Sequence, residues 1–247
     1  MTDKTRAGAL ILVAVLQVVA GFVGGAGLWG ESVGVVANSY PTLLLPSGAA
    51  FTIWSLIYVG FGALAVRQAL PRQRVRDVHQ RTGWWLVGAG VLNASWILLF
   101  TNRLLLPAQF VIVALLVCLL GAALRLQPAE GWLDRLLLHI PVMVYLGWVA
   151  VATVAGAATT AAAYDAAPGT AAAIVALLLT GLLAALAVLR LPAVAGFASA
   201  VCWALAWIAA NSTTTWVLVA ALVAIGTVAC GFVVRIDRPG KSTVAWG

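Results

Sequence analysis

The sequence predicts an all-α protein, a polytopic transmembrane helix bundle of about eight spans. Of its 247 residues, 64% are hydrophobic and 9% are charged, and the mean hydropathy is +1.07, whereas soluble domains are about 45–50% apolar. The apolar residues form runs that approach or exceed about 20 residues, the length that crosses the hydrocarbon core of a bilayer. Each such run has to be helical, because in lipid a helix satisfies its own backbone hydrogen bonds.

The predicted spans are the apolar runs between prolines, glycines and charged residues. They lie near residues 7–28, 47–69, 84–101, 105–124, 137–157, 170–189, 193–210 and 213–234. The first run is longer than the apolar core of a cleavable signal peptide, and no small-residue cleavage site follows it. We therefore interpret it as a retained span.

The basic residues predict the orientation of the bundle. With the N-terminus inside, 13 of the 14 lysines and arginines face the cytoplasm, and only Arg103 lies outside. Because positive charge collects on cytoplasmic loops, we expect both termini inside a bacterial cytoplasmic (inner) membrane, with 235–247 as a cytoplasmic tail. The net charge of +7 is then a topology signal, and we expect no nucleic-acid partner.

One long outside segment, residues 29–46, joins the first two spans. Two interpretations are open. The segment is a lid over the bundle, or it is an interfacial connector with Trp29 and Tyr40 at the level of the lipid headgroups, where amphipathic rings are favoured.

Aromatic and amide residues share one face on each of three spans. In the second, third and fifth spans these are Phe51, Trp54 and Tyr58; Asn93, Trp96 and Phe100; and Tyr145, Trp148 and Ala152. Residues three, four and seven apart lie on the same helical face, and an amide in a span needs a partner inside the bundle. This lining suits a large, flat, apolar ligand. The alternatives are plain aromatic packing and an interhelical hydrogen bond of Asn93 without any ligand.

Three short motifs resemble the TspO/translocator protein family, the tryptophan-rich sensory proteins (TspO/MBR). "FTIWSLIY" is similar to the family's W-x-x-x-Y in span two, "LNASW" to its N-x-x-W in span three, and "VYLGWVAVAT" to its P-Y-L-x-W-x-x-x-A in span five. The resemblance covers residues 7–157. It departs from the family before span two, where Pro41 and Pro46 are separated, and at the end of span five, where Leu-Asn reads Ala-Gly.

The resemblance implies a five-helix core, residues 1–157, with a pocket for a porphyrin, another tetrapyrrole, a haem precursor or a sterol-like molecule. The ligand-binding positions that it implies are Trp54, Tyr58, Asn93, Trp96, Tyr145, Trp148 and Ala152. The chain extends the short family form by three spans, residues 158–234. We expect these to pack against the core without forming the pocket.

Other residues that could carry chemistry are few. Cys118, Cys202 and Cys230 lie in apolar runs and are expected to be packing residues. His139 precedes Pro141 and is either an interfacial side chain or a ligand to metal or haem iron, and His79 is expected to be solvated. No metal ligand set, nucleophile motif or paired carboxylate is recognised in the sequence, so we predict no metal site and no required cofactor, with porphyrin or haem bound only as a ligand.

The predicted function is a membrane receptor or carrier that binds a hydrophobic ligand for sensing or transport and is not an enzyme. The alternatives are a small-solute transporter, which normally needs an intramembrane carboxylate or a broken helix pair, and a porphyrin-degrading membrane enzyme. Membrane lipid is the other expected partner. Trp203 and Trp207 share a face and are open to three interpretations: they seal the bundle, contact a second subunit in a homodimer, or face lipid.

Overall fold

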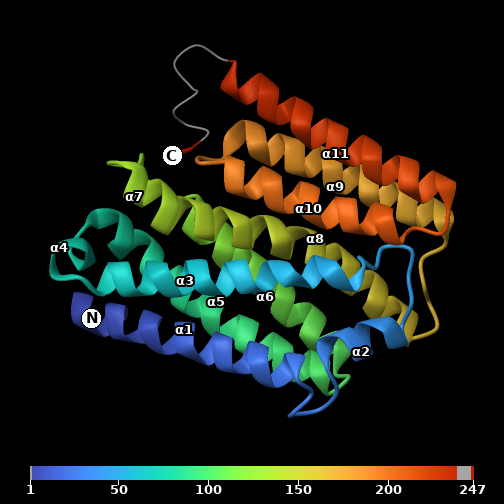
Figure 1. Ribbon diagram of the computed structural model, residues 1–247, viewed down its shortest axis with the longest axis horizontal. Coiled ribbons are helices and arrows are strands. Elements are labelled where there is room, and N and C mark those ends of the chain that lie inside the picture. Colours follow the sequence, from blue (N-terminus) through green and yellow to red (C-terminus); the bar gives the residue numbers. More distant parts are fainter. Residues whose placement is uncertain (1, 238–245) are drawn as a thin grey trace.

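The computed structural model describes residues 2–237 and 246–247, and over these residues the fold is all-helical (Figure 1). The predicted tail residues Arg238 and Lys241 lie outside the described residues. The α-helices are α1 (Asp3–Gly25), α2 (Val33–Ser39), α3 (Ile53–Ala69), α4 (Pro71–Arg74), α5 (Asp77–Thr101), α6 (Leu105–Ala123), α7 (Trp132–Asp134), α8 (Ile140–Ala163), α9 (Thr170–Arg190), α10 (Ala195–Asn211) and α11 (Thr215–Ile236). A 3₁₀ turn, η1 (Gly48–Thr52), runs into α3, and a π-helical turn, η2 (Arg135–His139), runs into α8.

The predicted polytopic helix bundle is confirmed. Among the described residues, seven helices are long and apolar enough to cross a membrane, and α10, with 17 residues, is a shorter apolar helix. Most boundaries agree with the predicted spans to within a few residues. The largest extension is at α5, which begins at Asp77 rather than near residue 84, because the polar residues before the apolar run continue the same helix.

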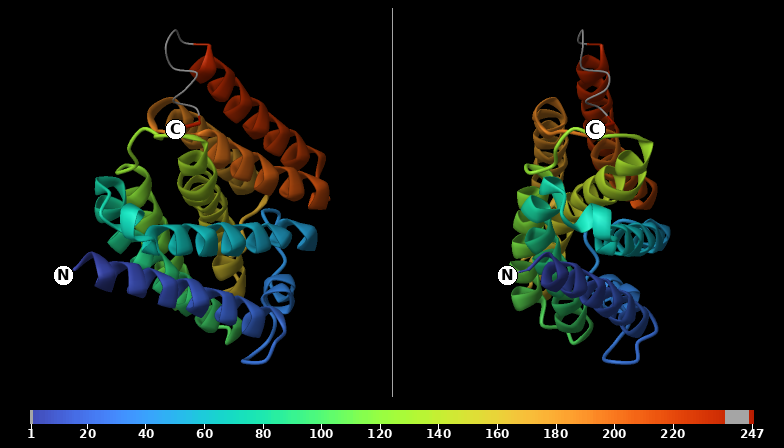
Figure 2. Two further views of the ribbon diagram at one scale, coloured as in Figure 1. Left: turned by 60° about the vertical axis from the view of Figure 1, so that its left-hand side comes forward. Right: turned by 90° about the vertical axis from the view of Figure 1, so that its left-hand side faces the viewer.

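The helices form two groups joined by α8. Helices α1, α3, α5, α6 and α8 pack side by side in one group, and α11 packs against both α9 and α10 in the other. Helix α10 lies along α8 and makes the main contact between the groups (Figure 2). A Cβ atom on Gly147 of α8 would lie 2.5 Å from the carbonyl oxygen of Phe197 on α10, so glycine is needed for this close helix approach.

The two ends of the bundle differ in charge. The end that carries α4, α7 and the N-terminus (Figure 1) also receives Arg125, Arg190 and Arg235, because successive long helices alternate in direction. We call it the arginine end. There, the buried carboxylate of Asp134 accepts hydrogen bonds from Arg67 and Arg76, and its interaction with Arg76 raises the pKa of that guanidinium above its ordinary value.

The histidines are more buried than the sequence indicates. His79 is fully buried at the start of α5, so the expectation that it is solvated is wrong. The reason is the early start of α5, which turns His79 inward. His139 is also buried, and its ring nitrogens lie 3.0 Å and 2.8 Å from the carbonyl oxygens of Asp134 and Gln127. These contacts hold η2 against the loop that precedes α7.

Candidate ligand pocket

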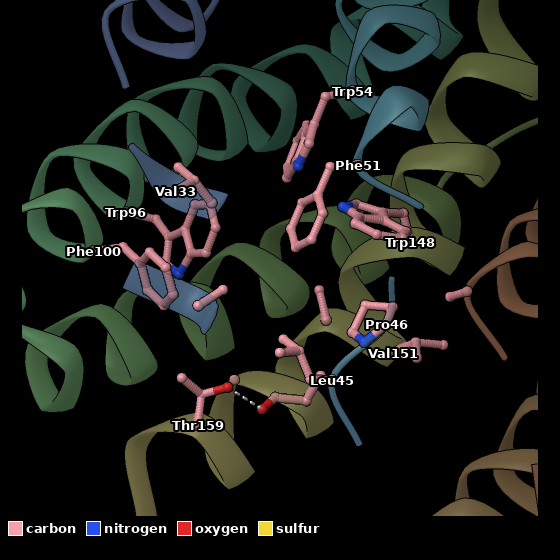
Figure 3. A pocket seen from close by; sticks show the side chains of 15 residues that line it. Val33, Leu45, Pro46, Phe51, Trp54, Trp96, Phe100, Trp148, Val151 and Thr159 are labelled. Atoms are coloured by element: carbon pink, nitrogen blue, oxygen red, sulfur yellow. Dashed lines mark hydrogen bonds between the residues drawn. The ribbon is translucent and has the colours of Figure 1, made fainter. Parts of the chain in front are cut away.

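A small cavity of about 50 Å³ lies near the end of the bundle opposite the arginine end. Its wall combines the predicted aromatic face with α2, the segment before α3, and α10. Figure 3 shows the side chains that line it, which include Val33, Leu45, Pro46, Phe51, Trp54, Trp96, Phe100, Trp148, Val151, Ala152, Thr159 and Ala204.

Trp54 is at the centre of the aromatic wall. Its ring stacks on Tyr58 at 5.4 Å and on Trp96 at 6.2 Å, and it meets Tyr145 and Trp148 edge-on at 5.9 Å and 6.2 Å. Phe51 packs edge-on against Trp148. The rings come from α3, α5 and α8 and η1, so the helical spacing seen in the sequence does gather them at one place.

A second cavity, of about 250 Å³, lies on the other side of this wall. It is bounded by α1, α2, α3 and α5, and Val33, Phe51, Trp54 and Trp96 line both cavities. Tyr58 lines only this second cavity. A movement of the Phe51 and Trp54 rings would therefore join the two spaces.

The wall of the first cavity carries few polar groups. The hydroxyl of Thr159 donates to the carbonyl of Ala155 on its own helix at 3.1 Å (Figure 3). The indole N–H of Trp148 is buried and has no hydrogen-bond partner among the described residues. An unpaired buried donor is costly, so this N–H is available to an acceptor on a bound molecule.

Asn93 and Tyr145 lie behind the pocket rather than in its wall. Both are fully buried or nearly so, and both donate to the same oxygen, Oε1 of Gln17 on α1, each at 3.3 Å. Within residues 2–237 and 246–247, the Nε2 of Gln17 and the Oδ1 of Asn93 have no hydrogen-bond partner. The structure thus separates the seven predicted positions into Trp54, Trp96, Trp148 and Ala152 on the first cavity, Tyr58 on the second, and Asn93 and Tyr145 in a polar layer beneath them.

Residues 29–47, which we call the lid, cover the pocket. Val33 and Ala37 of α2 lie on the cavity, while Trp29 remains 63% exposed. Arg103 fixes one side of the lid through Glu31, at 2.6 Å, and through hydrogen bonds to Ser39 and Tyr40. Both interpretations of this segment therefore describe part of it: α2 covers the cavity, and Trp29 stays at the surface.

Helix α10 fixes the other side of the lid. Ser47 N–H donates to the carbonyl of Trp207, Asn211 donates to that of Leu45, and the indole of Trp203 donates to that of Ala50. Ala204 of α10 also lines the cavity. The expectation that the last three spans do not form the pocket is therefore wrong, because the lid bridges the two helix groups.

The sequence does not single out Ala204, Leu45 or Val33 as pocket residues. They are ordinary apolar residues, and they reach the cavity only through the path of the lid and the α8–α10 contact. Gln17 and Asn211 carry a better signal, since amides within apolar runs need partners, although the sequence does not show which ones.

These features define an integral membrane protein, a helix bundle with an apolar pocket beneath a lid. A family model described as TSPO-like protein matches residues 6–234, and the chain belongs to this family of membrane ligand-binding and transport proteins. The match includes α9, α10 and nearly all of α11, beyond the residues 7–157 on which the motif resemblance rests. No curated protein and no solved structure matches the chain.

Proposed function

We propose that the protein is a membrane receptor or carrier that binds a flat, mostly apolar ligand, a porphyrin or another tetrapyrrole, in the pocket around Trp54. The observation that carries the proposal is the aromatic wall itself. Rings from η1, α3, α5 and α8 surround a cavity into which the buried Trp148 contributes an unpaired N–H. Aromatic faces stack on a conjugated macrocycle, and the N–H would meet a carboxylate or carbonyl at its edge.

Binding a tetrapyrrole requires the pocket to open. A cavity of about 50 Å³ is far below the roughly 300–1,000 Å³ of small-molecule sites. Joined to its neighbour of about 250 Å³ across Phe51 and Trp54, it reaches the lower end of that range. A tetrapyrrole would therefore have to displace these rings or raise the lid.

The transporter alternative receives less support. The described acidic residues lie at the two ends of the bundle rather than within the apolar spans, and coupled transport usually uses intramembrane carboxylates. Between the polar layer at Gln17 and the arginine end, the fully buried Leu10, Leu64 and Leu86 form an apolar layer. A hydrophilic solute would have no polar contacts in this layer.

The experiment is a titration of the solubilised protein with protoporphyrin, followed by its Soret absorbance. Trp54→Phe keeps a ring but reduces the stacking surface, and we expect binding to weaken about tenfold, which corresponds to about 1.4 kcal/mol. Trp148→Phe removes only the N–H donor and should weaken ligands that carry a carboxylate more than ligands that lack one.

Trp216→Phe is the control, because Trp216 is 69% exposed on α11 and lies outside both cavities. If wild type, Trp54→Phe and Trp148→Phe bind alike while remaining folded, the pocket assignment is wrong. The proposal also predicts binding without turnover, so the Soret band should persist in light and dark. Its protein-dependent loss in light would favour a porphyrin-degrading enzyme instead.

A further inference from the structure

A third cavity, of about 400 Å³, lies between the two helix groups and shares Val151 of α8 with the ligand pocket. Helices α6 and α8 form one side, and α9 and α10 form the other. Leu183 both lines it and is 64% exposed, so the cavity opens toward the bilayer as a groove. The groove exists because α9 makes few contacts with α8 and packs mainly on α11.

Among its described lining residues, the interior of this groove offers no free hydrogen-bond donor. Its lining consists of apolar residues and two threonines, and both hydroxyls are already used. Thr153 donates to the carbonyl of Val149 and Thr180 to that of Ala176, each at 2.7 Å within its own helix. A hydrocarbon occupant fits such a lining, whereas a sterol hydroxyl placed inside would find no donor there and only the oxygens of these two threonines as acceptors.

The groove has the depth of one leaflet. On α9 its lining runs from Thr180 to Leu191, which at about 1.5 Å per residue is about 16 Å. Half of a hydrocarbon core of about 30 Å is about 15 Å. On α6, α9 and α10 the lining lies in the halves nearer the arginine end, and on α8 it runs from Leu146 to Val154, just past the middle of the helix.

Positive charge lies at the mouth of the groove. Leu191 lines it, Arg190 precedes Leu191 and is exposed, and Arg235 donates to the carbonyls of Leu189 and Leu191. Within the described part of the chain, neither arginine forms an ion pair. Basic groups at this depth favour anionic headgroups.

We infer that the groove binds one anionic phospholipid from the leaflet at the arginine end. One acyl chain lies between α6/α8 and α9/α10, and the phosphate lies beside the exposed Arg190, with the buried Arg235 adding positive charge behind it. Helix α10 fills only part of the space between the two helix groups, and the lipid would fill the rest. This site is a different cavity from the pocket around Trp54, although Val151 lines both.

The test is native mass spectrometry of protein released from nanodiscs made of equal parts palmitoyl-oleoyl phosphatidylglycerol and phosphatidylcholine. Wild type should retain one phosphatidylglycerol in preference to phosphatidylcholine. Ala187→Phe fills the groove from α9, and Ala150→Phe fills it from α8; each should lower the retained lipid at least tenfold. Val175→Phe is the matched control, because Val175 is 55% exposed on α9 outside the groove.

The headgroup is tested separately. Arg190→Gln should keep a bound lipid but bring the ratio of the two lipids toward one, while Arg72→Gln, an equal charge change at an exposed site on α4, should leave the ratio unchanged. Gel filtration and thermal melting identify the folded variants. Equal retention of the two lipids by wild type, full retention by either folded filling variant, or a second protein copy in place of the lipid would each overturn the inference.

Discussion

At the residue scale, the most informative side chain is Gln17. It accepts two hydrogen bonds, from Asn93 and from Tyr145, and so connects α1, α5 and α8 within the apolar bundle. Asn93, which the sequence marks as a ligand-binding position, is fully buried on this network and makes no contribution to the cavity wall. We therefore expect a substitution of Asn93 to affect helix packing before it affects ligand binding.

Gln17→Leu should destabilise the protein more than Asn93→Leu. The Gln17 change leaves two buried donors, Asn93 Nδ2 and Tyr145 Oη, without their acceptor, and we expect the free energy of unfolding to fall by about 1–3 kcal/mol. The Asn93 change loses one hydrogen bond of 3.3 Å but also removes the Oδ1 that has no partner among the described residues. We therefore expect the free energy of unfolding to fall by about 0.6 kcal/mol or less. Unfolding in mixed detergent micelles measures both, and a larger loss for Asn93→Leu would contradict this assignment of the network.

At the element scale, the lid is held by two different kinds of contact. Arg103 holds it by exposed, charged interactions, and its hydrogen bond with Glu31 raises the pKa of the Arg103 guanidinium above its ordinary value. Helix α10 holds it through uncharged hydrogen bonds to backbone carbonyls and through a backbone N–H. Exposed ion pairs contribute little to stability and weaken in salt, so the Arg103 side is the one that opens more easily.

Arg103→Gln should loosen the lid without unfolding the bundle. We expect faster amide hydrogen exchange over residues 33–39 and an unchanged melting temperature, and high salt should have the same effect on the wild type. Arg81→Gln is the matched control, since Arg81 forms an exposed ion pair with Asp77 at the other end. Unchanged exchange in the Arg103 variant would show that α10 and packing alone hold α2.

The sequence predicts the long helices well and the short elements poorly. Runs such as 105–124 and 170–189 end almost where α6 and α9 end, because chain length and apolarity decide a transmembrane helix. The seven-residue helix α2 and the turns η1 and η2 have no such signal. They depend on contacts with distant residues, such as Thr101 with the backbone of Trp29 and Trp203 with Ala50.

At the scale of the whole molecule, the pocket belongs to both helix groups. A chain ending near residue 165 would retain α1 to α8 but lose Ala204 and the three hydrogen bonds between α10 and residues 45–50. We expect such a chain to bind protoporphyrin at least tenfold more weakly than the full chain in the same Soret titration. The full-length double variant Trp203→Phe/Asn211→Leu should show part of this loss, and full affinity in a folded truncated chain would contradict the role given to α10.

The charge asymmetry of the bundle predicts its orientation. We expect the arginine end, and with it both termini, to face the cytoplasm. A reporter that is active only in the cytoplasm should be active when fused after residue 237 and inactive when inserted at residue 167, between α8 and α9. The reverse pattern would invert the topology, and activity at both sites would mean that α9 to α11 do not cross the membrane as described.

The hydrogen bonds that Arg67 and Arg76 donate to Asp134 form a clamp that fixes one end of α3, so that a tilt of the helix would turn about this point. This clamp joins the last turn of α3 to the start of the α7–α8 segment. Trp54 lies at the opposite end of α3, 13 residues from Arg67. The distance along the helix axis from the clamp to Trp54 is therefore about 20 Å. A tilt of about 10° around the clamp would swing Trp54 sideways by about 3.5 Å at that rise per residue, comparable with the separation of carbon atoms in van der Waals contact. A rotation that barely disturbs the arginine end is thus enough to admit a flat ring beside the indole.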